Sequence, residues 1–178
     1  MSRKSYTNAL RFVQQANADR QWNVHILQRM ADIDMQRLDW KQALRVYEQI
    51  RTLRPDDEGA RKNLIEINLR MAQAAQASAE LESYLSYLQT SNNRAKAIPF
   101  IEELLAERSN DPTLLRNLAQ AYYQAGRIED AVTQLDSLAE ALLEVGKKEE
   151  AMVVINQILL MNPPNAEQYR QLLMQLKG

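Results

Sequence analysis

Apolar residues recur every three or four positions along most of the chain. One stripe of this kind runs from Leu114 to Ala125 and another from Leu135 to Leu143. Such i, i+3, i+4, i+7 spacing is typical of helices that bury one face against a neighbour. Strand signals are absent from the pattern. The sequence therefore predicts an all-α fold.

Caps and helix breakers divide this pattern into about ten antiparallel helices. Asp111 and Pro112 have the form of an N-cap followed by a proline at the first helical position, and Gly126 and Gly146 follow helices as C-caps. Pro99 fits if its helix starts near Ala97, and otherwise predicts a kink. The expected helices lie near residues 4–17, 20–36, 40–53, 57–71, 74–90, 94–109, 112–125, 128–145, 148–161 and 165–177. One long helix within 58–90 is the alternative.

A turn followed five residues later by an alanine recurs along the chain, at starting points separated by 34, 20, 34 and 20 residues. The combined period is 54 residues, and residues 40–93 share ten identities with residues 94–147. The five pairs are Leu38 and Ala43, Ala72 and Ala77, Asn92 and Ala97, Gly126 and Ala131, and Gly146 and Ala151.

This internal repetition predicts one domain over residues 1–178, built from units near 4–39, 40–93, 94–147 and 148–178. Helices that are joined by short connections and apolar on one wide face must stack on their neighbours. We therefore expect a right-handed α-solenoid, and a globular bundle is the weaker alternative.

Composition and charge disfavour several classes of function for this protein. The chain has no cysteine and one histidine, His25, which disfavours disulfides, zinc sites and His-based catalysis. Its net charge is −1, with a local +5 over residues 1–54 and −6 over residues 55–178. We find no signal peptide and no apolar run long enough to span a membrane. The expectation is a cytoplasmic protein without enzymatic activity, metal or cofactor.

The repeated residues resemble the tetratricopeptide repeat family over about residues 24–178. The resemblance departs from the family in one respect, because regular arrays advance by 34 residues whereas here 34 alternates with 20. The matching positions are large and small apolar residues around a turn: Leu27, Met30, Ala31, Leu38–Trp40, Ala43, Tyr47, Ile50 and Pro55; Leu118, Ala119, Tyr122, Gly126, Arg127, Ala131 and Leu135; and Leu138, Ala139, Leu142, Gly146, Lys147, Ala151, Ile155, Ile158 and Pro163.

The resemblance implies a surface, built mainly from first helices, that binds a peptide or a partner helix. Asn63, Asn117 and Gln171 fall at 54-residue steps as a ladder of amides, but Gly59 and Thr113 stand where a carboxylate clamp has lysines. The surrounding candidates are polar, charged or aromatic side chains on the same helix faces: Lys62, Arg116 and Arg170 as a basic column, with Glu66, Gln120 and Tyr123 beside it. The alternative is a solvated surface whose similarity reflects duplication.

The expected function is thus a non-catalytic interaction scaffold or adaptor, free or within a larger regulatory chain. A rival is self-assembly, in which apolar terminal faces pair end to end: Tyr6, Leu10 and Val13 at one end, and Leu172, Leu173 and Leu176 at the other. RNA recognition is disfavoured by the acidic two-thirds of the chain. Trp22, Trp40 and most methionines are expected to pack in the core or against a hairpin, with a partner contact as the alternative for the tryptophans.

Overall fold

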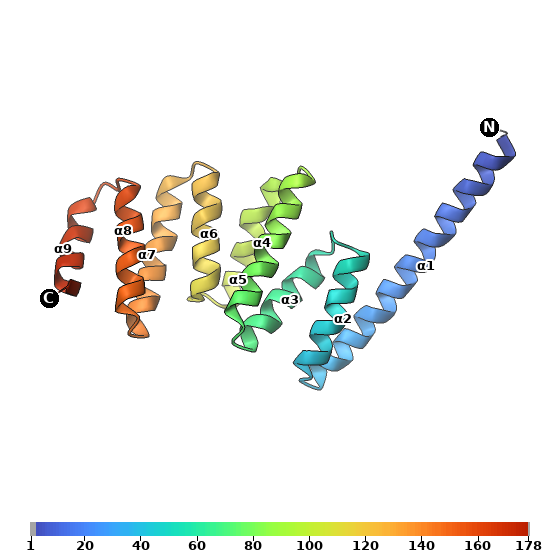
Figure 1. Ribbon diagram of the computed structural model, residues 1–178, viewed down its shortest axis with the longest axis horizontal. Coiled ribbons are helices and arrows are strands. Elements are labelled where there is room, and N and C mark those ends of the chain that lie inside the picture. Colours follow the sequence, from blue (N-terminus) through green and yellow to red (C-terminus); the bar gives the residue numbers. More distant parts are fainter. Residues whose placement is uncertain (1–2, 178) are drawn as a thin grey trace. The chain divides into compact units, whose positions relative to one another are not determined.

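The computed structural model describes the backbone of residues 3–177, and the side chains of residues 15, 18, 19 and 22–177. The described chain is all-α. Its elements, shown in Figure 1, are α1 (Arg3–Gln36), α2 (Trp40–Leu53), α3 (Glu58–Arg70), α4 (Ala74–Thr90), the 3-10 turn η1 (Arg94–Lys96), α5 (Ala97–Glu107), α6 (Pro112–Gln124), α7 (Ile128–Glu144), α8 (Lys148–Leu160) and α9 (Ala166–Lys177).

Helix α1 corrects the expected division at residues 17–20. The structure has one helix of 34 residues where the sequence pattern suggested two. The intervening residues Asn17–Arg20 contain neither glycine nor proline, and Asp or Asn alone does not end a helix that is continuous on both sides. The long-helix alternative over 58–90 is also wrong, because α3 ends at Arg70 and α4 begins at Ala74. Pro99 lies in the first turn of α5, where its missing N–H is tolerated.

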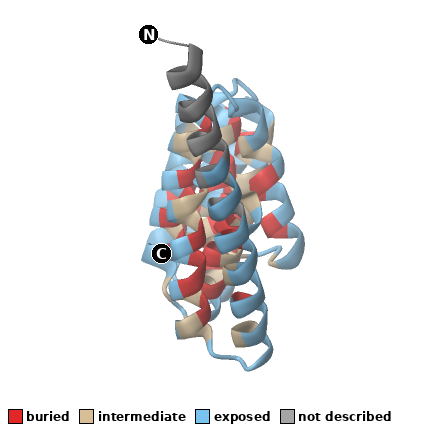
Figure 2. Ribbon diagram, turned by 90° about the vertical axis from the view of Figure 1, so that its right-hand side faces the viewer, coloured by how far each residue is buried: buried red, intermediate tan, exposed pale blue. Residues whose placement is uncertain are grey.

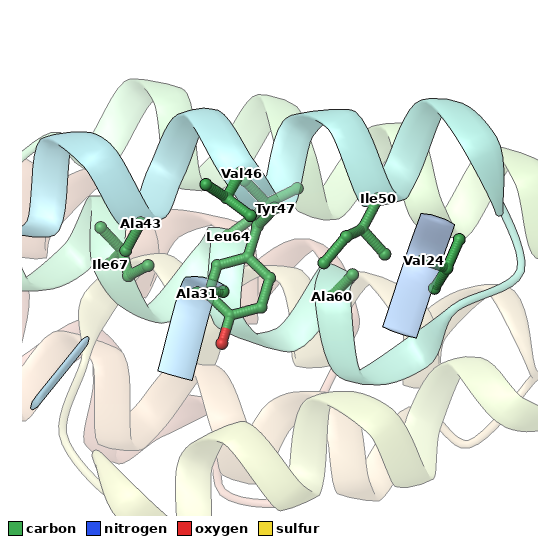
Figure 3. Close-up of a cluster of buried hydrophobic side chains, with 9 residues drawn as sticks. All are labelled: Val24, Ala31, Ala43, Val46, Tyr47, Ile50, Ala60, Leu64 and Ile67. Atoms are coloured by element: carbon green, nitrogen blue, oxygen red, sulfur yellow. The ribbon is translucent and has the colours of Figure 1, made fainter. Parts of the chain in front are cut away.

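The chain divides into two compact units, Met1–Tyr84 and Leu85–Gly178, with the boundary inside α4. In the first unit, α2 packs between α1 and α3. Figure 3 shows the buried side chains that these three helices contribute, and Figure 2 shows buried positions on the helix faces that are turned toward neighbours. The cluster consists of Val24, Ala31, Ala43, Val46, Tyr47, Ile50, Ala60, Leu64 and Ile67.

In the second unit, consecutive helices from α5 to α9 pack on one another in antiparallel order. The core is formed by leucine, isoleucine, alanine and tyrosine side chains with little or no solvent exposure. Leu173, expected on an exposed terminal face, is buried, while Leu172 and Leu176 are half-buried. Tyr6, Leu10 and Val13, the other proposed terminal face, lie outside the described side chains. Each unit is thus a row of antiparallel helices, as in an α-solenoid.

The turn-and-alanine pattern has one backbone conformation throughout. All five turn residues have positive φ, from 58° at Ala72 to 75° at Gly126 and Gly146. In each case the next amide donates to the carbonyl five residues earlier, at 2.8 or 2.9 Å, which is the hydrogen bond of a Schellman C-cap. The alanines that follow are fully buried at four of the five positions, 43, 77, 131 and 151. The pattern found in the sequence is therefore a left-handed cap followed by a close helix contact.

This geometry predicts opposite effects of glycine and alanine at the turns. Leu38 and Ala72 occupy a conformation that costs an L-residue about 1–2 kcal/mol, and neither side chain is buried. We predict that Leu38→Gly and Ala72→Gly each stabilise the fold by about 0.5–1 kcal/mol.

The matched controls are Gly126→Ala and Gly146→Ala, which should each destabilise by about 1 kcal/mol. An added Cβ at either glycine meets nothing within 4 Å, so backbone strain alone is tested. Urea unfolding followed by circular dichroism provides the measurement. A loss of stability in Leu38→Gly and Ala72→Gly would contradict the assignment.

A buried ion network joins α2, α3 and α4 in the first unit. Glu80 on α4 accepts from Arg61 Nη1 on α3 at 2.7 Å and also from Arg51 on α2. The Arg61 Nε donates to the carbonyl of Pro55 at 3.2 Å, and its guanidinium lies 5.4 Å from the centre of the Tyr84 ring. Because Arg61 and Glu80 are only 5% and 7% exposed, Arg61 depends on Glu80 for its compensating charge, while Glu80 is compensated by both Arg61 and Arg51.

Removing one member of this network leaves a buried charge without its partner. We predict that Glu80→Ala destabilises the first unit by about 3–5 kcal/mol. Arg51→Ala should cost about 1 kcal/mol, because Arg51 is partly exposed and Arg61 still pairs with Glu80. Tryptophan fluorescence during urea unfolding reports on this unit, which contains both tryptophans. Equal effects of the two substitutions would contradict the account.

Candidate functional site

The first unit contains an open cleft between α1 and α3, with Tyr47 of α2 between them. Its volume is about 520 Å³. It brings together cationic, anionic, amide, phenolic and apolar groups from three helices. The lining residues are Arg29, Asp32, Ile33, Met35, Gln36, Tyr47 and Asn63. We call this surface the α1–α3 cleft.

Tyr47 is the buried polar residue of the cleft. Burial, followed by the negative charges of Asp32, Glu66 and Asp57, raises the pKa of Tyr47 to about 12. The phenol therefore stays protonated at neutral pH and keeps its hydrogen-bond donor. Its ring packs within the core shared by α1, α2 and α3, so the hydroxyl has a fixed place.

Three residues that the sequence singled out lie on α3. Asn63 lines the cleft, and its Nδ2 donates to the carbonyl of Gly59 at 2.9 Å. Lys62 forms an ion pair with Glu66 at 3.8 Å, and both side chains are largely buried. The expected basic column therefore begins with a lysine whose charge is already paired within its own helix.

Four further candidates lie on α6 in the second unit. Arg116, Gln120 and Tyr123 are exposed and separated by four and three residues, so they share one outward stripe of the helix. Asn117 is instead buried, and its Nδ2 donates to the Thr113 carbonyl at 2.8 Å. Asn63 and Asn117 thus repeat the same bond to the carbonyl four residues earlier, and one amide N–H of each is used within its own helix.

Arg170 and Gln171 complete the predicted set on α9, where both are exposed. Arg170 forms an ion pair with Glu167 at 3.0 Å. A second cavity, of about 490 Å³, lies between α7 and the α8–α9 connection, but it contains neither residue. Its walls include Val132, Pro163 and Tyr169, and burial together with the charge of Asp136 raises the pKa of Tyr169.

Sequence reasoning missed most of the cleft. Arg29, Asp32 and Gln36 look like ordinary solvated positions of an amphipathic helix, and only their spacing of three and four residues indicates a common face. Tyr47 was recognised as a repeat residue and assigned no binding role. Trp22 and Met30 were expected to pack, yet they are 65% and 44% exposed, which corrects that expectation. Met174 is likewise 71% exposed.

The described residues show no group of three or more His, Asp or Glu side chains placed to hold a metal ion. Among the described helices, none combines the length and the apolar character that crossing a membrane requires.

A tetratricopeptide repeat family model matches residues 88–138, from the end of α4 into α7. Residues 88–138 therefore resemble tetratricopeptide repeat sequence, and the described chain is a helical-repeat protein. The resemblance seen in the sequence is confirmed, while the alternating 34- and 20-residue spacing stays a prediction. No curated protein sequence matches this chain. Tetratricopeptide repeats are generally non-catalytic modules that bind protein partners.

Several solved structures are similar to this chain at low TM-scores. MamA from Desulfovibrio magneticus RS-1 is 14% identical, with 87% of this chain and 95% of that chain covered and a TM-score of 0.38. A thermophilic TPR protein from Thermus thermophilus is 15% identical, with 86% and 98% covered and a TM-score of 0.31. YrrB, a TPR protein with an unusual peptide-binding site, is 12% identical, with 79% and 88% covered and a TM-score of 0.30.

The protonated phenol of Tyr47 gives a pH prediction. Because its pKa is raised from 10.0 to about 12, the folded state holds this proton more tightly than the unfolded state does. The resulting stabilisation is complete below pH 10 and is lost as the pH rises toward 12. The phenolate absorbance of the Tyr47→Phe variant is subtracted from that of the wild type at each pH. The difference should show one group that ionises near pH 12, and Asp32→Asn should lower the pKa of that group. A difference curve centred near pH 10 would contradict the assignment.

Proposed function

We propose that this protein is a non-catalytic interaction scaffold or adaptor that binds a peptide or partner helix of another protein. The observation that carries the proposal is the α1–α3 cleft, because it collects the complementary groups that a polypeptide needs. Peptide recognition requires hydrogen-bond donors and acceptors for the backbone, and apolar and charged contacts for side chains. The cleft supplies these through Tyr47 and Asn63, through Met35, and through Arg29 and Asp32.

The mechanism is preorganisation. Tyr47 is held by the core, and α3 is held against α2 and α4 by the Arg61–Glu80 network, so the walls of the cleft are set before a ligand arrives. Binding then requires little ordering of the protein, and the contacts that form contribute more of their energy to affinity. A bound segment would accept a hydrogen bond from the Tyr47 hydroxyl and exchange bonds with the Asn63 amide.

The candidates on α6 and α9 lie in the second unit, and we propose them as a separate binding surface there. On α6, Arg116, Gln120 and Tyr123 present a cation, an amide and an aromatic ring to solvent, beside the buried amide of Asn117. On α9, Arg170 and Gln171 present similar groups. We propose that these helices contact the same class of partner. We also propose that the protein acts in the cytoplasm, that it binds neither nucleic acid nor a membrane, and that it needs no metal or cofactor.

The test starts from peptides selected from a random displayed library on the immobilised full chain. Their affinities for wild type and variants are then measured in solution by fluorescence polarisation. Removing one hydrogen-bonding or charged group should weaken binding roughly 3- to 10-fold, so we predict this loss for Asn63→Ala and for Arg29→Ala. The matched control is Asn156→Ala on α8, which removes an exposed amide with the same bond to a carbonyl four residues earlier.

If Asn63→Ala and Arg29→Ala bind the selected peptides as tightly as wild type does, the cleft is not the binding surface. Arg116→Ala and Tyr123→Ala then test the α6 stripe in the same assay. Peptides that lose affinity only for these α6 variants would move the proposed site to the second unit. Failure to select any peptide would contradict the peptide-binding function itself.

A further inference from the structure

One face of α1 carries exposed apolar side chains. Trp22, Ile26, Met30 and Ile33 are 65%, 43%, 44% and 48% exposed. Their separations of four, four and three residues place them along a single stripe of the helix. Asp19 precedes the stripe by three residues and Arg37 follows it by four, and both are exposed. We call these six residues the α1 stripe.

This stripe lies opposite the face of α1 that packs in the core. At about 100° per residue, Val24 and Ala31 point roughly 150° away from the centre of the stripe, and both are buried against α2. The stripe is therefore not part of the contact between α1 and α2. Figure 1 also shows that the ribbon of α1 extends past the end of α2.

The exposed face of α9, the last described helix, is mostly polar, in contrast to the stripe on α1. On α9, the exposed side chains include Glu167, Arg170 and Gln171, and Met174 is the large apolar exception. Four large apolar side chains on the outer face of α1, including a tryptophan, are instead typical of an interface.

The order of residues along the stripe is matched by a second copy of the same stripe. When two copies of α1 are laid antiparallel about a point near residue 28, Ile26 faces Met30 of the other copy and Trp22 faces Ile33. Each contact then occurs twice, as a two-fold interface requires. In the same register Asp19 lies opposite Arg37 at both ends of the stripe. The apolar centre and the charged ends are thus complementary to a second copy in one orientation.

We propose that two copies of this chain associate through antiparallel pairing of their α1 stripes. The stripe from Asp19 to Arg37 spans roughly 27 Å of helix, at about 1.5 Å per residue. Trp22 packs at each end of the apolar centre, and the Asp19–Arg37 pairs select the antiparallel orientation over the parallel one, which would set like charges against each other. The test of this interface contains no peptide, so its failure is distinguishable from failure of the peptide-binding proposal.

Disulfide trapping tests the register directly, because the chain has no cysteine of its own. Ile26→Cys and Met30→Cys variants are purified, mixed and oxidised, and the products are weighed by mass spectrometry. Antiparallel pairing predicts that the mixed Ile26→Cys/Met30→Cys dimer exceeds both homodimers several-fold, because disulfides need Cβ atoms about 3.5–4.5 Å apart. Val153→Cys on α8, which is 68% exposed, is the control for random collision.

Charge exchange tests the same register without a covalent bond. Light scattering over a concentration series should show a mass that approaches twice 20.5 kDa for wild type. Asp19→Arg and Arg37→Asp alone should each weaken the dimer roughly 5- to 20-fold, and the two changes in one chain should restore it. Trp22→Ala should weaken it about 30-fold or more, as expected for an interface hot spot, with unchanged helicity because the side chain is exposed in the single chain.

Three results would overturn the proposal. A mass of 20.5 kDa at every concentration would show that the stripe does not pair with a second copy of the chain. Preferential Ile26–Ile26 cross-linking would show a parallel pair. A dimer that is unaffected by Trp22→Ala and by either charge variant would place the interface elsewhere on the chain.

Discussion

The structure depends on one repeated constraint, the left-handed cap that ends a helix shortly before the next helix begins. With so short a connection, the two helices must cross close together, and only a small side chain fits at the crossing. The alanines five residues after the caps at 38, 72, 126 and 146 meet this requirement, and all four are fully buried. Leu38 and Ala72 adopt the same left-handed conformation in spite of its cost to an L-residue.

The position of the candidate site depends on this constraint and on one buried ion pair, Arg61–Glu80, within the otherwise apolar core. The cap at Leu38 and the buried Ala43 pair α1 with α2, and the shared apolar cluster packs α3 on the other side of α2, which leaves the cleft between α1 and α3. The Arg61–Glu80 ion pair then joins α3 to α4 with buried charges in place of apolar contacts. A buried ion pair is sensitive to the geometry of its partners, so this network specifies the position of α3 more narrowly than apolar packing does.

Local signals in the sequence predicted most of the fold. Helix spacing, the N-cap at Asp111 and the recurring alanines all depend on residues a few positions apart, and they located the helices from residue 40 onward correctly. The site was predicted only in part, since Asn63 lies in the cleft whereas Asn117 is buried. The ion network escaped prediction because Arg61 and Glu80 are 19 residues apart on different helices. Trp22 was assigned to packing because periodicity reports which residues share a face, and it does not report whether another helix covers that face.

The central claim is that a partner segment binds in the α1–α3 cleft, and amide hydrogen exchange of the full chain with and without a saturating selected peptide tests it most directly. The account predicts slower exchange on both walls of the cleft, in residues 29–36 and 59–66, and unchanged exchange in α8, which carries no part of the proposed surface. Protection confined to α8 or distributed evenly over the chain would contradict it.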